Sequence, residues 1–209
     1  MTVDSQPRKR RWSSRFAALL RWIHIYISML GFAALMFFGF TGLTLNHPTW
    51  FGASEVVITD EQGELPEALL ANSEGAEQTI DKLGIAEWLR AEHHLSGRVT
   101  EFSADEFELF VVFKGPAYSV DVFVDRTSRK YTLTESRAGI VAALNDLHRG
   151  RDSGEGWAWL IDVSAIVTLL MSVSGFALIF YIRRRRTTGL LAALAGTIAL
   201  VVVWFAFVP

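Results

Sequence analysis

The sequence predicts a membrane protein with three transmembrane α-helices and an inserted extracytoplasmic α+β domain. Three observations lead to this fold class. The chain of 209 residues contains three long apolar runs. The polar stretch between the first two runs changes its apolar period from 3.6 residues to 2, as expected where a helix is followed by strands. Arginine clusters lie before the first run and between the last two.

Each apolar run is long enough to cross a bilayer as a helix. Between Leu19 and Leu45 the only charged residue is Arg21, and the runs Val163–Ile182 and Leu190–Val208 contain no charge. A hydrocarbon core of about 30 Å requires about 20 apolar helical residues. The first run is longer than the roughly 7–15 apolar residues of a cleaved signal peptide, so we expect it to remain as an anchor.

Charge predicts the orientation in the membrane. The basic residues near the runs are Arg8, Lys9, Arg10, Arg11, Arg15, Arg21 and Arg183–Arg186. Short segments rich in arginine stay in the cytoplasm, where they contact anionic lipid. The segment Asn46–Trp157 has 20 acidic and 10 basic residues, a net charge of −10. We therefore expect a multi-pass protein of a bacterial inner membrane, with a cytoplasmic amino terminus, a periplasmic acidic domain and no nucleic-acid partner.

The polar stretch has the pattern of a small α+β domain. We expect a short strand at Ser54–Thr59, a helix at Glu77–His94 and a second helix at Ala138–His148. Alternating apolar residues separated by turn signals predict an antiparallel meander. Its expected strands are Arg98–Ser103, Glu106–Lys114, Tyr118–Asp125 and Lys130–Glu135. Packing one helix on this sheet would bury the apolar face of each.

The apolar face of each domain element can be assigned from its period. The residues expected to share the buried face of the second meander strand are Phe107, Leu109, Val111 and Phe113. Those expected on one broad face of the first helix are Ile80, Leu83, Ile85, Trp88, Leu89 and Leu95. His93 and His94 lie at the exposed end of this helix. Adjacent helical side chains diverge too far to bind one metal, so we expect both histidines to be solvated.

These elements define the expected domain organisation. It consists of a disordered basic cytoplasmic tail at 1–14, a first span at 15–47, a periplasmic domain with its connecting helix at 48–158, a second span at 159–182, a cytoplasmic arginine loop at 183–189 and a third span at 190–208. The chain has no cysteine, which excludes disulfides, iron–sulfur clusters and thiol catalysis. It also lacks the hydrolase, metalloprotease and nucleotide-binding motifs, so we do not expect it to be an enzyme on its own.

Two segments resemble the PepSY-associated transmembrane family. The first is RWIHIYISMLGFAALMFFGFTGLTLNHP, which contains His24, Thr41-Gly42 and Asn46-His47. The second begins LNDLHRGRDSGEGW, with Leu147-His148, and continues to Ser174-Gly175 midway along its apolar run. The similarity covers residues 15–186, and the stretch between the segments is similar to a PepSY domain.

The resemblance implies two kinds of function. Longer relatives with more spans include reductases of ferric siderophores, which hold b-type haem between membrane histidines. PepSY units in protease propeptides act as inhibitors or chaperones of exported proteases. This chain has only three spans, so it departs from the longer reductases.

The histidines are the candidate haem ligands. His24 and His47 lie 23 residues apart on one helix, about 35 Å, and cannot bind one metal. His47 and His148 both fall at the outer boundary, where they could bind haem b with Arg149 and Arg151 on the propionates. Alternatively, these histidines sit at helix ends because the helix dipole and the interface favour them. His24 could pair with its own copy in a dimer or reach lipid phosphates.

Three functional hypotheses follow for this chain. The first is an accessory or electron-transfer component in iron, haem or redox handling, working with another membrane subunit or as a homo-oligomer. The second is a membrane-anchored binding module, whose acidic domain docks or inhibits an exported protease or other partner protein. The third is a structural subunit of a larger membrane assembly.

Overall fold

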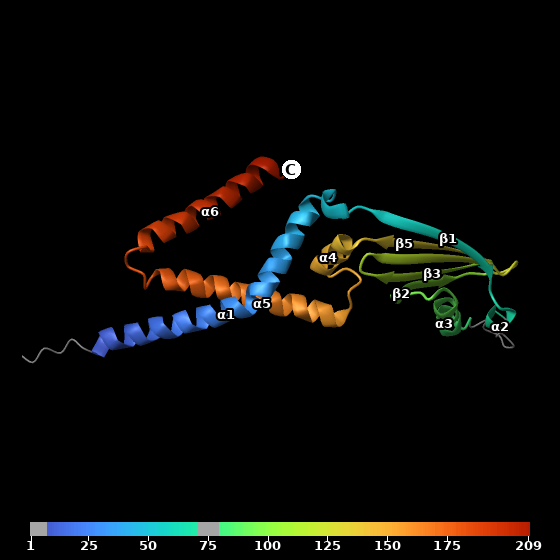
Figure 1. Cartoon of the computed structure of the whole chain (residues 1–209), viewed down its shortest axis with the longest axis horizontal. Helices are drawn as coiled ribbons and strands as arrows, with labels where there is room; N and C mark the ends of the chain where they lie inside the picture. Colours follow the sequence, from blue (N-terminus) through green and yellow to red (C-terminus); the bar gives the residue numbers. More distant parts are fainter. Residues whose placement is uncertain (1–7, 71–79) are drawn as a thin grey trace, which may run out of the picture. The chain divides into compact units, whose positions relative to one another are not determined.

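The computed structural model describes residues 8–70 and 80–209, with side chains from Ser14 onward. It contains three long helices, α1 (Arg8–Asn46), α5 (Glu155–Ile179) and α6 (Arg186–Phe207) (Figure 1). Each has a segment long and apolar enough to cross a membrane: Ser14–Asn46, Glu155–Ile179 and Arg186–Phe207. Helix α1 begins at Arg8, so the part of the expected disordered tail that the structure describes is helical. Both later helices begin four residues before the predicted spans.

The chain forms two compact units. One consists of Phe37–Ile161, and the other of Asp162–Pro209 with the described part of Met1–Met36. In the helical unit, α1 and α5 approach closely at Gly31, where an added Cβ would lie 2.8 Å from Val167 Cγ1. Small residues permit this kind of close packing between membrane helices. No described residue of α6 is buried, and most of its residues are exposed.

The domain in Phe37–Ile161 contains one antiparallel sheet of five strands, in the order β1-β5-β4-β3-β2. The strands are β1 (Val56–Glu64), β2 (Arg98–Ala104), β3 (Glu108–Gly115), β4 (Tyr118–Asp125) and β5 (Lys130–Ala138). The predicted meander is therefore correct from β2 to β5. The first strand is longer than the predicted Ser54–Thr59, because β1 pairs with β5 along its whole length, from Val56 opposite Ala138 to Glu64 opposite Lys130.

Helix α3 (Lys82–His93) packs on one face of the sheet and closes the core. Its first turn is capped by Asp81, whose carboxylate accepts a hydrogen bond from the Gly84 amide at 2.8 Å. The buried core residues on the facing elements include Ile85, Leu89, Leu109, Val111, Phe113, Val120, Val122, Val124, Tyr131 and Leu133. Two predicted core residues are exposed: Leu83 by 71% and Phe107 by 65%. Phe107 lies in the turn before β3, where its amide donates to Asp105 at 2.8 Å.

The expectation that His93 is solvated is wrong. Its ring contacts side chains from two adjacent strands, with Nδ1 2.7 Å from Glu61 Oε2 on β1 and Nε2 2.7 Å from the Tyr131 hydroxyl on β5. The Tyr131 side chain in turn crosses Gly63 on β1, and any Cβ at that position would overlap its hydroxyl. His93 therefore links α3 to β1 and β5. His94 ends the helix in a left-handed conformation with φ of 53°.

Three short helices connect these parts. They are η1 (Trp50–Gly52), α2 (Glu67–Leu70) and α4 (Ile140–Arg149). The first helical positions predicted for Glu77–His94 lie outside the described residues. Helix α4 corresponds to the predicted Ala138–His148, and it leads from β5 to the loop before α5.

Candidate functional site

Most of the buried polar residues that the structure describes either belong to helix α4 or contact it. It begins after Gly139 and ends at Gly150, whose φ of 69° is a left-handed conformation that glycine adopts at low cost. The Gly150 amide donates back to the Asp146 and Leu147 carbonyls, which closes the helix. The two buried residues of α4 are both polar, Asn145 and Asp146.

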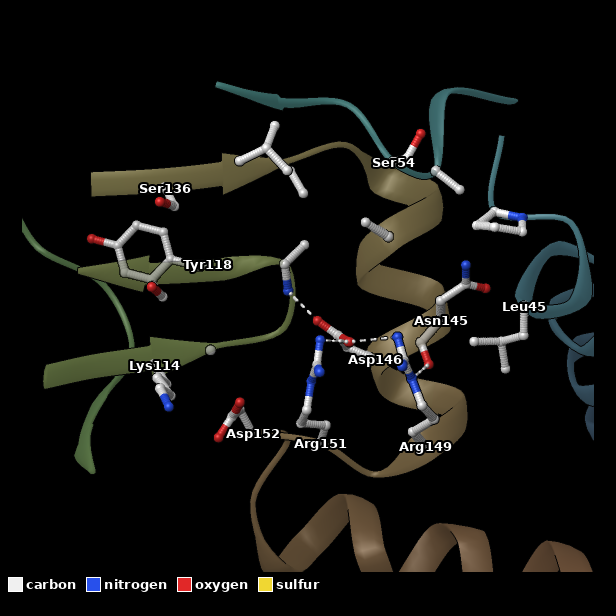
Figure 2. Close-up of a pocket in the computed structure, with 18 of the residues that line it drawn as sticks. Leu45, Ser54, Lys114, Tyr118, Ser136, Asn145, Asp146, Arg149, Arg151 and Asp152 are labelled. Atoms are coloured by element: carbon white, nitrogen blue, oxygen red, sulfur yellow. Dashed lines mark hydrogen bonds and ion pairs between the residues drawn. The ribbon is translucent and has the colours of Figure 1, made fainter. Parts of the chain in front are cut away.

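Asp146 joins α4 to the turn between β3 and β4. Its Oδ2 accepts a hydrogen bond from the Ala117 amide at 2.9 Å. Its Oδ1 lies 2.7 Å from Arg151 Nη2 and 3.2 Å from Arg149 Nη2 (Figure 2). The carboxylate side chain is only 9% exposed, whereas the two arginines are 48% and 59% exposed. A buried carboxylate with three donors is satisfied, so Asp146 is the polar anchor of this corner.

The end of α1 is tied to α4 through two threonines that are fully buried. Thr44 donates to Asn145 Oδ1 at 2.6 Å. The Thr41 hydroxyl lies 2.5 Å from His148 Nδ1 and 2.6 Å from the Phe37 carbonyl. Thr41 has a single proton, and the bond to its own helix uses it, so the hydroxyl accepts from His148 Nδ1. This arrangement sets the His148 tautomer, with the proton on Nδ1 and a lone pair on Nε2.

The surroundings of His148 favour its neutral form over the charged one. Burial lowers the pKa of its imidazole below the ordinary 6.5, and the positive charge of neighbouring Arg149 lowers this pKa further. The ring packs edge-on against Phe38, with 5.0 Å between centroids. Among the described residues, none is hydrogen-bonded to Nε2. A neutral imidazole with its far nitrogen held by an oxygen is the usual arrangement of a histidine that binds a metal.

The other predicted ligands lie in different surroundings. The His47 ring stacks on Trp50 at 4.0 Å, with an angle of 10° between planes. His47 follows Thr41, the partner of His148, by six positions, which corresponds to about 9 Å of helical rise. The described contacts therefore do not bring the His47 and His148 rings together. His24, in the helical unit, has its Nδ1 2.8 Å from the hydroxyl of buried Ser174, beside Gly175.

A cleft of about 470 Å³ opens beside Asp146. Helix α4, the β3–β4 turn, the end of β5 and the segment that follows α1 form its walls (Figure 2). Its charged lining residues are Lys114, Asp146, Arg149, Arg151 and Asp152. The predicted propionate ligands Arg149 and Arg151 thus line this cleft, whereas His47 and His148 do not.

Sequence analysis missed four residues of this corner. They are Thr41, Thr44, Asn145 and Asp146. Thr41 belongs to the Thr41-Gly42 pair that supports the family resemblance, and Asp146 precedes Arg149 by three residues, the spacing of a helical ion pair. Their partners lie 101 to 107 residues away or across a turn, which no local pattern indicates. In the described part of the chain, no three histidine, aspartate or glutamate side chains are grouped to hold a metal ion.

Three long apolar helices with a helix-on-sheet domain inserted between the first two define the class: a membrane-anchored α+β domain protein. A sequence model of the family described as "Putative PepSY_TM-like" matches residues 18–209, and the chain belongs to this family. The match extends past the predicted resemblance at 15–186 and includes α6. No curated protein and no solved structure matches the chain.

Proposed function

We propose that this protein binds haem b at the outer boundary of a bacterial inner membrane and serves as an accessory electron-transfer component in iron or redox handling. The observation that supports the proposal best is the state of His148. Burial lowers the pKa of its imidazole and so favours the neutral ring, its Nδ1 lies 2.5 Å from the Thr41 hydroxyl, and no described residue is hydrogen-bonded to its Nε2. A histidine that binds haem iron needs a neutral ring with a fixed tautomer.

The remaining ligands in this proposal are His47, Arg149 and Arg151. To bind the same iron, the His47 ring has to leave Trp50, on which it stacks at 4.0 Å. The two arginines would pair with the propionates through donors that Asp146 does not use, since each guanidinium has five N–H groups. When bound, haem supplies one-electron transfer. His24 is on the same helix but is bonded to Ser174, and it would ligate only together with a second copy.

The proposed topology follows from charge. The amino terminus and the Arg183–Arg186 link lie in the cytoplasm, and the domain with its net charge of −10 lies in the periplasm. The chain has no flavin or nicotinamide motif, so another component has to deliver electrons. The open surface of α6 is available for another membrane subunit or a second copy.

An absorption spectrum of the full chain tests the haem proposal. The protein is purified in detergent after expression with added haem, and the Soret band is measured. We expect the band to be lost in His148→Ala and strongly reduced in His47→Ala. His94→Ala is the matched control, because this histidine lies on the domain at the end of α3. A protein that stays colourless after haem loading, or a band that survives in His148→Ala, would rule the proposal out.

A second function is favoured by the exposed edge of the sheet. Strand β1 is an edge strand of nine residues, and eight of them are exposed. Its first three residues are apolar and 53–68% exposed: Val56, Val57 and Ile58. An unprotected edge of this kind can accept an extended segment of another chain as an added strand. In this alternative the domain docks onto an exported protein or inhibits it.

Site-specific photo-crosslinking in cells separates the second function from the first. A crosslinker at Ile58 should give one discrete product with an exported protein, and a crosslinker at Glu101 on the opposite edge strand β2 should not. Ile58→Lys should abolish the product, because it places an unpaired charge in the apolar contact. Equal crosslinking from both positions would reject the docking edge.

A further inference from the structure

The cleft beside Asp146 has the opposite charge from the domain that contains it. Asn46–Trp157 has 20 acidic and 10 basic residues, a net charge of −10. Three of the basic residues and only two of the acidic ones line the cleft, a net charge of +1. The three basic residues come from separate elements: Lys114 from β3, Arg149 from the end of α4 and Arg151 from the loop that follows α4.

The basic groups keep donors that no described residue uses. Asp146 takes one Nη2 from each arginine, and both arginine side chains remain about half exposed. Lys114 is exposed, and its ammonium group makes no hydrogen bond or ion pair with any residue that the structure describes. Ser54, Ser119 and Ser136 add hydroxyl groups to the lining. Guanidinium and ammonium groups around a space with hydroxyl donors suit an anion with several acceptor oxygens.

The opposite wall of the cleft is apolar. It is formed by Leu45 and Pro48, at the end of α1, and by Ala53 and Val56 further along the chain. The first candidate span ends at Asn46, and the second begins at Glu155, three residues after the lining residue Asp152. Both apolar spans therefore end within a few residues of this cleft, so we place it at the level of the lipid headgroups.

We propose that this cleft binds the phosphate group of an anionic phospholipid. The phosphate meets Lys114, Arg149 and Arg151, since arginine pairs with phosphate in two-pronged geometry. The first part of the acyl chain lies along Leu45 and Pro48. The cleft of about 470 Å³ accommodates a headgroup rather than a whole lipid. A zwitterionic lipid adds a cationic amine beside three basic groups, so phosphatidylglycerol binds more tightly than phosphatidylcholine.

Native mass spectrometry of the full chain in detergent tests this assignment. The probes are short-chain phosphatidylglycerol, short-chain phosphatidylcholine, glycerol phosphate and inorganic phosphate. We expect phosphatidylglycerol to bind about tenfold more tightly than phosphatidylcholine, and Lys114→Gln or Arg151→Gln to weaken it by about tenfold each, the loss of roughly one charge-assisted contact. Lys130→Gln is the charge-matched control, because Lys130 lies at the opposite end of β5 from the cleft.

The variants distinguish binding from folding. Arg151 also holds Asp146, whereas Lys114 has no such contact, so the Lys114→Gln result stands even if Arg151→Gln unfolds α4. Equal binding of the two lipids, or no loss in Lys114→Gln, overturns the proposal. Glycerol phosphate binding as tightly as phosphatidylglycerol overturns the lipid as the source. The inference does not rest on haem binding, and the phosphate takes the place that the proposed function gives to the propionates at Arg149 and Arg151. If Arg151→Gln shifts the Soret band and leaves lipid binding unchanged, the arginine holds a propionate and the lipid assignment is wrong.

Discussion

Replacing Asp146 tests whether one buried carboxylate holds α4 on the domain. In Asp146→Ala the Ala117 amide loses its acceptor at 2.9 Å, and Arg149 and Arg151 lose their common partner. A buried donor left without an acceptor costs about 1–3 kcal/mol, and the Ala117 amide, which is half-buried and lines the cleft, falls in the lower part of that range. Breaking a fully buried ion pair costs about 3–5 kcal/mol. That second figure applies only in part, because the arginines are 48% and 59% exposed and water solvates them after the change.

We therefore expect Asp146→Ala to lower the free energy of unfolding of the domain by about 2–4 kcal/mol. For a domain of this size that corresponds to a fall in Tm of roughly 10–20 °C. Asp146→Asn is the matched control. It keeps an acceptor for the Ala117 amide and loses only the charge, so its effect should be about half as large.

The assay is thermal unfolding of the full chain in detergent, followed by circular dichroism, with hydrogen exchange at the Ala117 amide as the local measurement. Asp146→Ala should accelerate exchange at this amide and along α4, while exchange in the central strands β3 and β4 stays slow. A change in Tm below about 2 °C, or unaltered exchange at Ala117, would refute the assignment of Asp146 as an anchor.

The other predictions concern a glycine, a histidine and a helix contact. Gly63→Ala should lower the stability of the domain by about 1–3 kcal/mol, because the new methyl group overlaps the Tyr131 hydroxyl. Urea unfolding measures this change, and a variant as stable as the wild type would show that Tyr131 moves aside freely. His148 has a lowered pKa in the folded protein, so near its ordinary value of 6.5 the unfolded state binds more protons. Stability should be full above about pH 6.5 and fall on acidification toward the lower folded pKa, and His148→Gln should lack this slope in pH-dependent melting. Gly31→Ala places a Cβ 2.8 Å from Val167 Cγ1, so it should lower the yield of a disulfide formed in membranes between cysteines introduced into α1 and α5. Gly39→Ala, which meets nothing within 4 Å, should leave that yield unchanged.

The apolar runs and the meander could be predicted from sequence because both are local properties. A run of about 20 uncharged residues is long enough to span a bilayer whatever it packs against. The alternation in Tyr118–Asp125 puts Val120, Val122 and Val124 on one face of any strand, and all three are buried. The prediction that Phe107 and Leu83 are buried was wrong. Phe107 lies just before β3 and Leu83 in the first turn of α3, and the apolar period alone does not indicate where an element begins.

The candidate site depended on tertiary structure for a physical reason. Whether a polar residue is a surface group or a buried anchor is decided by what lies opposite it, and the partners of Thr41 and Thr44 are about a hundred residues away. Sequence identified His148 as a candidate and Arg149 and Arg151 as its neighbours. Only the folded chain showed that the two arginines pair with Asp146 and line a cleft. His47 and His148 are not part of the lining of that cleft.

By itself, then, the sequence determined which segments are apolar enough to span a membrane and what period each element has, since hydropathy and alternation are properties of neighbouring residues. It also indicated the family, through strings that lie in the first two spans and just before the second. Tertiary structure alone decided which polar side chains face one another, because a hydrogen bond of 2.5 Å between Thr41 and His148 requires two distant helices to be placed to within a fraction of an ångström.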